Sequence, residues 1–262
     1  MKLANLPRAL RRNLETVRLL GNWSAVVGVG LHGKAKTNRL QFRNGVVLQG
    51  QSAEILEFLF HEVWIGQAYS PPGYEIRRGD TVIDAGANIG AFAMFAATRA
   101  PDVKVYSFEP FGSNVAWLRK NLADSGLSNV QVFQQAIAGS SGQRPFFIEP
   151  GNCMFHSLYC DVASDGSKRL HEMVECTTLD EIFTAHQIKC CHVLKLDCEG
   201  AELEILENSS PGTLSRVRKI VGEFHGAYKL DSLRQFLESH SFQFEFSQSG
   251  TFRATNTSAL MS

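Results

Sequence analysis

Downstream of Asp80 the sequence alternates short apolar segments with helical ones, and this alternation limits the available folds more than any other feature. Strands that alternate with helices form βαβ units, because two parallel strands need a long crossover connection between them. The resulting sheet is mostly parallel and carries helices on both faces. The expected strands are residues 81–84, 104–108, 130–136, 144–148, 192–196 and 219–224, and the expected helices are residues 86–99, 114–125, 179–184, 201–208 and 231–240. A closing hairpin of residues 242–246 and 251–254 is expected to give this α/β domain an antiparallel edge.

The residues before this domain have a different pattern, and we expect an N-terminal extension built of helix and short strands. Leucines at helical spacing predict a helix over residues 3–20, and residues 53–64 are also expected to be helical. The segments between them that are expected to be extended are residues 24–29, 40–42 and 46–48. The boundary is therefore predicted near residue 50, with the extension at 1–50 and the main domain at 51–262.

The extension is basic although the chain as a whole is neutral. Residues 1–39 hold eight lysines and arginines against one acid, Glu15, whereas the formal net charge of the chain is +0. A neutral chain lacks the basic excess of a nucleic-acid-binding protein, so nucleic acid is not expected as a partner. The basic segment suits an anionic substrate, a membrane surface or a partner, and equally a solvated helix face. The oligomeric state stays open, a homodimer included.

Apolar runs and cysteines indicate the compartment. No run approaches the ~18 apolar residues that a membrane span needs, and arginines interrupt the N-terminal stretch where a secretory signal would lie. The six cysteines are irregularly spaced and include no Cys-x-x-Cys pair, so neither a disulfide framework nor a zinc site is expected. We therefore predict reduced thiols and a cytoplasmic location.

A glycine-containing segment directly after the first strand is the clearest candidate for a ligand site. It reads Asp84-Ala-Gly-Ala-Asn-Ile-Gly90, and its glycines let the backbone turn tightly and approach a ligand closely. In open α/β sheets, ligands bind beyond the carboxyl ends of the strands. Glu109 ends the next strand, 25 residues after Asp84, where a carboxylate can bind both ribose hydroxyls of an adenosine cofactor.

Two adenosine cofactors fit such a segment, and the charge of Asp84 distinguishes between them. A dinucleotide would place its pyrophosphate on the loop, where a carboxylate repels it. S-adenosylmethionine carries an ammonium and a sulfonium, which nearby negative charge stabilises. The segment also lacks the Gly-x-Gly-x-x-Gly spacing of dinucleotide sites. The sequence therefore favours S-adenosylmethionine over NAD, and the non-functional alternative is a turn in which Asp84 only caps a helix.

Polar side chains end two further strands and are expected at the same edge of the sheet. Asp197 follows one strand, and Glu223 and His225 end the next. Methyl transfer to a hydroxyl requires an aligned donor and acceptor and the removal of a proton. We expect His225 to be that base, oriented by Asp197, since imidazole titrates near neutral pH. The same three side chains could instead hold a divalent metal that orients a diol, or serve the fold as a helix cap and a structural histidine.

These motifs together resemble the FkbM family of methyltransferases. The matching segments are Val82-Ile-Asp-Ala-Gly-Ala-Asn-Ile-Gly90, Phe108-Glu-Pro110, Thr178-Leu-Asp-Glu181, Leu194-Lys-Leu-Asp-Cys-Glu-Gly-Ala-Glu202 and Glu223-Phe-His225. The resemblance extends over about residues 53–246, and the segment 194–202 is its most specific part. It implies a class I, Rossmann-like methyltransferase fold, for which an antiparallel C-terminal hairpin is typical. It also implies S-adenosylmethionine as donor and O-methylation of a sugar or natural-product scaffold.

The resemblance implies roles for individual residues as well. Those implied to bind the cofactor are Asp84, Gly86, Ala87, Asn88, Gly90, Glu109, Pro110 and Ala136, the last near the adenine. Those implied to face the acceptor are Lys195, Asp197, Glu199 and His225. Residues 154–158 are similar to a serine-containing loop that covers the site in the family.

The sequence thus predicts a cytoplasmic O-methyltransferase that acts with S-adenosylmethionine on a small hydroxylated acceptor. Catalysis is assigned to His225, Asp197 and Lys195, with no metal in this principal interpretation. Three alternatives remain: a metal-dependent O-methyltransferase with Asp197, Glu223 and His225 as ligands, an NAD-linked oxidoreductase, and a cofactor-binding module without chemistry of its own.

Overall fold

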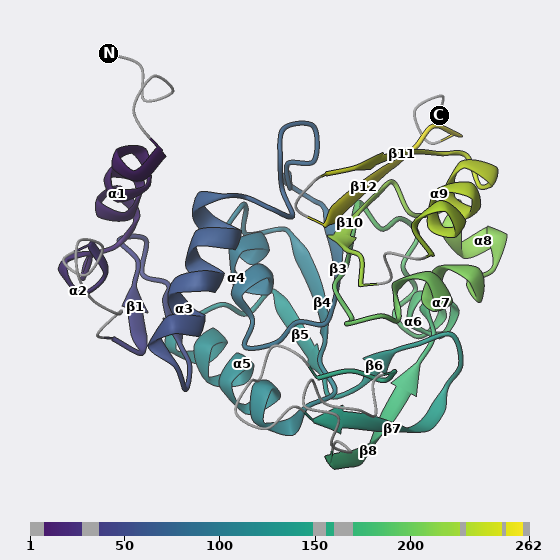
Figure 1. Cartoon of the computed structure of the whole chain (residues 1–262), viewed down its shortest axis with the longest axis horizontal. Helices are drawn as coiled ribbons and strands as arrows, with labels where there is room; N and C mark the ends of the chain where they lie inside the picture. Colours follow the sequence, from purple (N-terminus) through teal and green to yellow (C-terminus); the bar gives the residue numbers. More distant parts are fainter. Residues whose placement is uncertain are drawn as a thin grey trace.

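A seven-stranded sheet forms the centre of the protein in the computed structural model (Figure 1), with strand order β11-β12-β10-β9-β3-β4-β5. The structure describes residues 8–27, 37–148, 156–159, 170–225, 229–247 and 250–258. The strands of the sheet are β3 (Thr81–Ala85), β4 (Lys104–Phe108), β5 (Val130–Phe133), β9 (Val193–Leu196), β10 (Lys219–Glu223), β11 (Phe242–Phe246) and β12 (Thr251–Asn256). Five strands are parallel, and β12 runs antiparallel to both β10 and β11. The predicted class I, Rossmann-like α/β fold with its antiparallel C-terminal hairpin is confirmed.

Helices cover both faces of this sheet, because successive strand residues point to opposite sides. In β3, Val82 packs into one core with the helices α3 to α5, whereas Ile83 packs into a second core with α6 to α9. The helices are α3 (Ala53–Leu59), α4 (Ala91–Ala97), α5 (Gly112–Asp124), α6 (Leu179–Ala185), α7 (Glu202–Glu207), α8 (Pro211–Leu214) and α9 (Leu230–Ser239). Strand order reverses between β3 and β9, so the crevice for a ligand lies at their carboxyl ends.

A second, three-stranded sheet departs from the sequence prediction. It consists of β6 (Ala136–Ile137), β8 (Leu170–Thr177) and β7 (Gly142–Ile148), in that order. The prediction of one strand over residues 130–136 is therefore wrong, because the chain leaves the main sheet after Phe133 and enters the second sheet at Ala136. Strand β8 was not predicted, since Leu170 and Met173 are exposed and its residues show no clean alternation of apolar and polar side chains.

The N-terminal extension packs directly on the main domain. It contains α1 (Arg8–Leu19), α2 (Ser24–Val27) and a hairpin of β1 (Arg39–Gln41) with β2 (Val47–Gln49). The backbone N–H and C=O of Gln49 both bond the Asn121 side-chain amide on α5, each at 2.9 Å, which joins the hairpin to the main domain. In the part of the chain that the structure describes, no helix has the length and apolar character needed to cross a bilayer.

Of two predictions for this region, one is confirmed and the other is wrong. The helix predicted over residues 53–64 is present as α3, which continues as a π-helix, η2 (Phe60–Ile65). The prediction that residues 24–29 are extended is wrong for residues 24–27, because Ser24–Val27 forms a helical turn. Residues 28 and 29 lie outside the described residues. Local bonds from Ala25 and Val26 N–H to carbonyls three residues earlier stabilise that turn against the β preference of valine.

Candidate active site

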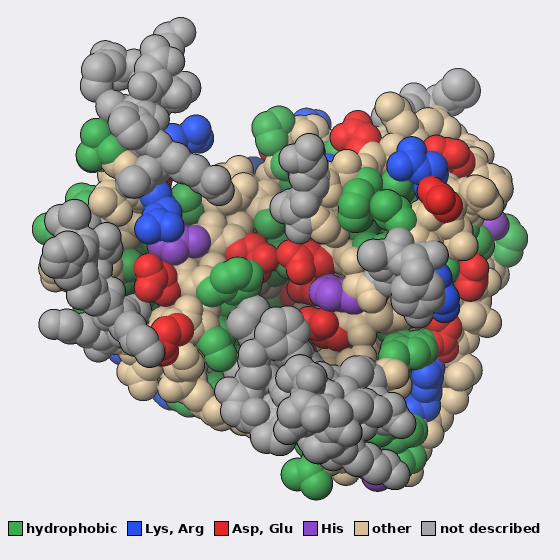
Figure 2. All heavy atoms as spheres, viewed as in Figure 1, with side chains coloured by type: hydrophobic (Ala, Val, Ile, Leu, Met, Phe, Trp, Pro, Cys, Tyr) green, Lys and Arg blue, Asp and Glu red, His purple; other side chains and the backbone are tan. Residues whose placement is uncertain are grey.

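A cavity of about 290 Å³ lies beyond the carboxyl ends of β3, β4, β9 and β10. Its volume is close to the lower end of small-molecule sites, ~300–1,000 Å³. Ten residues assigned from sequence to the cofactor or the acceptor line it: Gly86, Ala87, Asn88, Glu109, Pro110, Ala136, Lys195, Asp197, Glu199 and His225. Figure 2 shows acidic side chains and a histidine gathered around a hollow near the middle of the viewed face. The predicted edge of the sheet is therefore where the candidate residues meet.

Left-handed backbone shapes the loop between β3 and α4. Gly86, Asn88 and Gly90 have φ angles of 75°, 50° and 93°. Such residues cannot continue a right-handed helix, so α4 begins at Ala91 and not at Gly86 as predicted. A Cβ on Gly86 would overlap the carbonyl oxygen of Asp197, which is why only glycine lets the loop pack against the end of β9. Gly90 does not line the cavity.

Glu109 is held in the cavity wall by the backbone around it. Its Oε2 accepts a hydrogen bond from Asn88 N–H at 2.8 Å, and its Oε1 accepts one from Phe111 N–H at 2.9 Å. Burial raises the pKa of Glu109 to about 7, although these hydrogen bonds favour the ionised form. A carboxylate keeps further lone pairs for donors. The side chain is thus oriented to accept bonds from a vicinal diol in the cavity.

Asp84 is fully buried and does not line the cavity. Lys195 Nζ lies 3.3 Å from Asp84 Oδ1 and donates a hydrogen bond to Gly86 O at 2.7 Å, so the ion pair also supports the loop. Burial raises the pKa of Asp84, and the charge of Lys195 opposes that shift. The negative charge that the sequence assigned to the cofactor is therefore balanced by Lys195 within the protein.

Besides Glu109, four carboxylates from three segments face the cavity, and they give it a strongly acidic wall. They are Glu62 on η2, Asp197 and Glu199 after β9, and Glu223 at the end of β10. Burial and the charges of Glu223 and Asp197 raise the pKa of Glu62 to about 8, and burial raises that of Glu199 to about 7. Ionised carboxylates this close together would repel one another, which favours their protonated forms, and a cation bound among them would relieve that repulsion.

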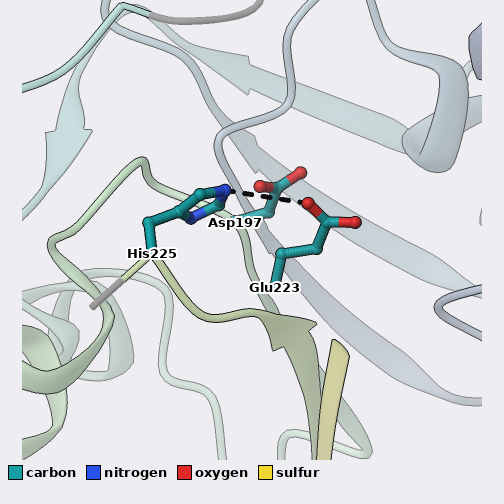
Figure 3. Close-up of side chains that lie close together, drawn as sticks. All are labelled: Asp197, Glu223 and His225. Atoms are coloured by element: carbon teal, nitrogen blue, oxygen red, sulfur yellow. Dashed lines mark ion pairs between the residues drawn. The ribbon is translucent and has the colours of Figure 1, made fainter. Parts of the chain in front are cut away.

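Asp197 is held by two buried donors. Tyr69 Oη donates a hydrogen bond to Asp197 Oδ2 at 3.0 Å, and Lys195 Nζ lies 3.4 Å from the same oxygen. Lys195 also pairs with Asp84. A continuous chain of polar contacts therefore connects Tyr69, through Asp197 and Lys195, to Asp84 near the end of β3. Asp197, Glu223 and His225 together form a group of possible metal ligands (Figure 3). Each side chain offers one ligand atom, and these atoms all lie within 4.8 Å of one another.

His225 is surrounded by carboxylates, and Glu202 orients it. Its Nδ1 lies 3.1 Å from Glu202 Oε1, and its Nε2 lies 3.6 Å from Glu199. The same Nε2 lies 3.7 Å from Glu223, the ion pair drawn in Figure 3. Burial alone would lower the pKa of His225, but the bond to Glu202 and the surrounding negative charges raise it to about 9. The prediction that Asp197 orients this ring is wrong, because Asp197 turns to Tyr69 and Lys195 instead.

Three residues of the candidate site, Glu62, Tyr69 and Glu202, were not predicted from the sequence. Glu62 and Tyr69 precede the first strand of the main sheet, where nothing in the local pattern indicates a ligand site. Glu202 lies in the most specific motif, yet no role at the site was expected for it. The N–H groups of Cys198 and Gly200 both donate to Glu202 Oε1, which fixes the oxygen that meets His225.

The segment predicted to cover the site is partly described. His156 and Leu158 line the cavity, whereas residues 154 and 155 lie outside the described residues. Ser157 Oγ donates a hydrogen bond to Glu199 O at 2.6 Å and so connects this segment to the acidic wall.

The chain is similar to known methyltransferases. The family model of the methyltransferase FkbM domain matches residues 84–244. The 31-O-demethyl-FK506 methyltransferase FkbM of Streptomyces tacrolimicus is 27% identical over 246 residues, covering 82% of this chain and 93% of that protein. The hexuronic acid methyltransferase AglP of Haloferax volcanii is 28% identical over 151 residues, 58% of each chain. Among solved structures, M. capricolum TrmK with S-adenosyl-homocysteine has a TM-score of 0.44 at 11% identity, over 74% of this chain and 67% of that one.

The family match covers more than half of the chain and contains the cofactor loop, Glu109, Lys195, Asp197 and His225. Glu62 and Tyr69, by contrast, lie before the matched segment and reach the same cavity from η2 and the turn after it. The chain belongs to the FkbM-domain family of methyltransferases.

Proposed function

We propose that the protein transfers a methyl group from S-adenosylmethionine to a hydroxyl group of a small acceptor, a sugar or a natural-product scaffold. One observation carries this proposal: a single cavity contains the loop Gly86–Asn88, Glu109, and the acceptor-side residues Asp197 and His225. The methyl donor must lie in line with the acceptor oxygen, so both halves of the reaction need one enclosed space.

The residues present fit S-adenosylmethionine. The Glu109 carboxylate is oriented for the ribose hydroxyls, Ala136 and Pro110 supply apolar wall for the adenine, and the acidic wall suits an ammonium and a sulfonium. When bound, the cofactor supplies an electrophilic methyl group. His225, in its neutral form, accepts the proton of the acceptor hydroxyl, with Glu202 holding the ring.

The acceptor class follows from the cavity and from the relatives. Polar groups that bind hydroxyls share the wall with apolar side chains such as Phe58, Phe92 and Leu158, which suit a scaffold with a hydrophobic part. The names of the two relatives refer to 31-O-demethyl-FK506 and to a hexuronic acid. Within this proposal the domain spans residues 51–262, residues 1–50 form an extension, the location is cytoplasmic, and no nucleic acid takes part.

Calorimetric titration with S-adenosylhomocysteine tests the cofactor site. We expect micromolar binding that Glu109→Ala weakens by more than about tenfold, ~1.4 kcal/mol. The matched control is Glu207→Ala, an exposed carboxylate at the end of α7 that lies outside the cavity. Binding of NAD in place of S-adenosylhomocysteine would overturn the proposal. Binding without turnover on a panel of hydroxylated acceptors would leave only a cofactor-binding module.

The affinity for S-adenosylhomocysteine is expected to depend on pH through Glu109. Its pKa is raised to about 7, and only the ionised carboxylate can accept bonds from both ribose hydroxyls. Affinity should therefore be full above pH 8 and fall by about tenfold by pH 6, one unit below that pKa. Glu109→Gln should bind weakly with no such dependence. A dissociation constant that is flat from pH 6 to 8 in the unaltered protein would contradict this assignment.

A second candidate, a metal-dependent O-methyltransferase, is favoured by the arrangement of Asp197, Glu223 and His225. Their ligand atoms lie within 4.8 Å of one another, and Glu62 and Glu199 place further carboxyl groups in the same cavity wall. One nitrogen and several carboxylate oxygens suit a divalent ion such as Mn²⁺ or Mg²⁺. The ion would have to displace the proton from His225, so its affinity should rise with pH.

Metal binding can be measured separately from turnover. If this second candidate holds, Mn²⁺ titration followed by electron paramagnetic resonance should show one site that Glu223→Gln weakens by tenfold or more. Activity should then disappear in a chelator and return with magnesium or manganese. Full activity after exhaustive chelation, together with no Mn²⁺ binding at pH 8, would exclude this candidate and leave the metal-free mechanism.

A further inference from the structure

Helix α1 turns its apolar stripe toward solvent. Leu10, Leu14 and Val17 follow one side of the helix at spacings of four and three residues. Leu10 and Leu14 are 47% and 42% exposed, whereas the polar Thr16, on another side of the helix, is 1% exposed. A helix that packs on a core normally buries its apolar side. Leu10 and Leu14 of this stripe are therefore available for another surface, whereas Val17 is half-buried.

Positive charge flanks the apolar stripe. At 100° per residue, Arg11 and Arg18 lie beside Leu14 on the helix surface, and both are exposed. The only acid in the helix, Glu15, lies 4.0 Å from Arg18. Arg43, in the turn between β1 and β2, donates from Nε to the carbonyl of Val17 at 3.2 Å. Leucines bordered by arginines are typical of helices that lie in the headgroup region of anionic membranes.

The position of α1 allows a flat surface to approach it. Figure 1 shows α1 at the periphery of the molecule, outside the layers formed by the main sheet and its helices. Its inner side contacts η2, where burial and the charge of Arg12 lower the pKa of His61 to about 4. Glu62, the next residue of η2, lines the cavity, and so does Phe58, whose side chain is 49% exposed. A surface bound by α1 would thus lie one helix away from the cavity.

We propose that α1 binds the protein to the surface of an anionic lipid bilayer, with Leu10 and Leu14 among the headgroups and Arg11 and Arg18 against lipid phosphates. The apolar stripe supplies burial, and the flanking arginines supply the charge complementarity that selects anionic lipid. A second copy of the chain is a poorer match, because a symmetric contact through the stripe would bring the arginines of both copies together. This function goes beyond methyl transfer and does not depend on it.

Flotation with lipid vesicles tests the proposal on the full chain. The protein should float with phosphatidylcholine vesicles that contain ~30% phosphatidylserine and not with phosphatidylcholine alone, and 0.5 M salt should weaken binding to the anionic vesicles, because salt screens surface charge. Leu10→Ser/Leu14→Ser should reduce the partition coefficient by about tenfold or more. Arg11→Gln/Arg18→Gln should reduce it several-fold and remove most of its salt dependence.

The matched control replaces two exposed apolar side chains elsewhere, both more exposed than Leu10 and Leu14. Leu170→Ser/Met173→Ser, on β8, should bind vesicles as the unaltered protein does. All variants should keep the melting temperature and S-adenosylhomocysteine binding of the unaltered protein, since these side chains touch neither core nor cavity. Absence of vesicle binding, or equal binding by Leu10→Ser/Leu14→Ser, would overturn the proposal. A dimer in solution that this double variant dissociates, without vesicle binding, would assign the stripe to a second copy instead.

Discussion

Replacement of His225 by alanine is expected to lower kcat by about 10²–10⁴-fold, the range that a positioned general base contributes. His225 lines the cavity, and its Nε2 is the ring nitrogen that Glu202 leaves available to a substrate. Removing the imidazole leaves the acceptor hydroxyl without a proton acceptor that titrates in the useful range. Binding of S-adenosylhomocysteine should change by less than about threefold, because the ribose site at Glu109 is untouched.

The pH profile separates a base from a merely structural histidine. The pKa of His225 is raised to about 9, so the ring is protonated at pH 7 and its basic form increases as the pH rises. The value of kcat/KM should therefore climb by about tenfold per unit below pH 9 and level off above it. Glu202→Gln removes the charge that raises this pKa, so the plateau should begin at lower pH.

A matched histidine serves as the control for this prediction. His240, at the end of α9, lies outside the cavity, and His240→Ala should retain full kcat and the same pH profile. A His225→Ala variant with kcat within about threefold of the unaltered enzyme would contradict the assignment. A profile without a rise between pH 7 and 9 would contradict it as well.

Replacement of Lys195 by methionine is expected to lower the free energy of unfolding by about 3–5 kcal/mol, the usual cost of removing one partner of a buried ion pair. Lys195 is 3% exposed and Asp84 is 0% exposed, and their charged atoms lie 3.3 Å apart. Methionine would leave the Asp84 carboxylate buried beside no positive charge. It would also remove the hydrogen bond to Gly86 O that supports the cofactor loop. Urea unfolding followed by circular dichroism measures the loss.

A double-mutant cycle distinguishes the ion pair from simple loss of packing. Asp84→Asn/Lys195→Met removes both charges together, so it should be more stable than Lys195→Met alone by about 1–3 kcal/mol. Lys120→Met, in the exposed pair with Asp124 on α5, should cost less than about 1 kcal/mol. A cost below about 1 kcal/mol for Lys195→Met would show that the pair does not hold the site together.

Much of the fold was predictable because it depends on residues that are adjacent in sequence. The buried strands β3, β4, β9 and β10 were each recognised from short apolar runs followed by helical spacing. The two errors have different origins. At residues 130–136 a continuous β-like run belongs to two sheets, so pairing with strands distant in sequence overrode the local pattern. At Ser24–Val27 local hydrogen bonds form a helical turn in spite of the β preference of valine.

The candidate site was predictable in position and only partly in detail. The rule that ligands bind at the carboxyl ends of parallel strands brought Glu109, Asp197 and His225 to one edge. It could not show that Asp84 pairs with Lys195, or that Glu202 holds His225. Glu62 reaches the cavity from a π-helical turn, a geometry that no spacing in the sequence indicates.

The sequence by itself determined the α/β fold, the loop after β3 with its two glycines, and the strand ends at which the candidate site residues gather. These features follow from the periodicity of apolar residues and from the backbone freedom of glycine, which are properties of neighbouring residues. Only the tertiary structure decided which carboxylates face one another and which protons they hold. Tyr69 meets Asp197 across 128 positions of sequence, and His225 owes its pKa to acids on other segments. Burial and charge act through space, so the chemistry of the site exists only once the chain is folded.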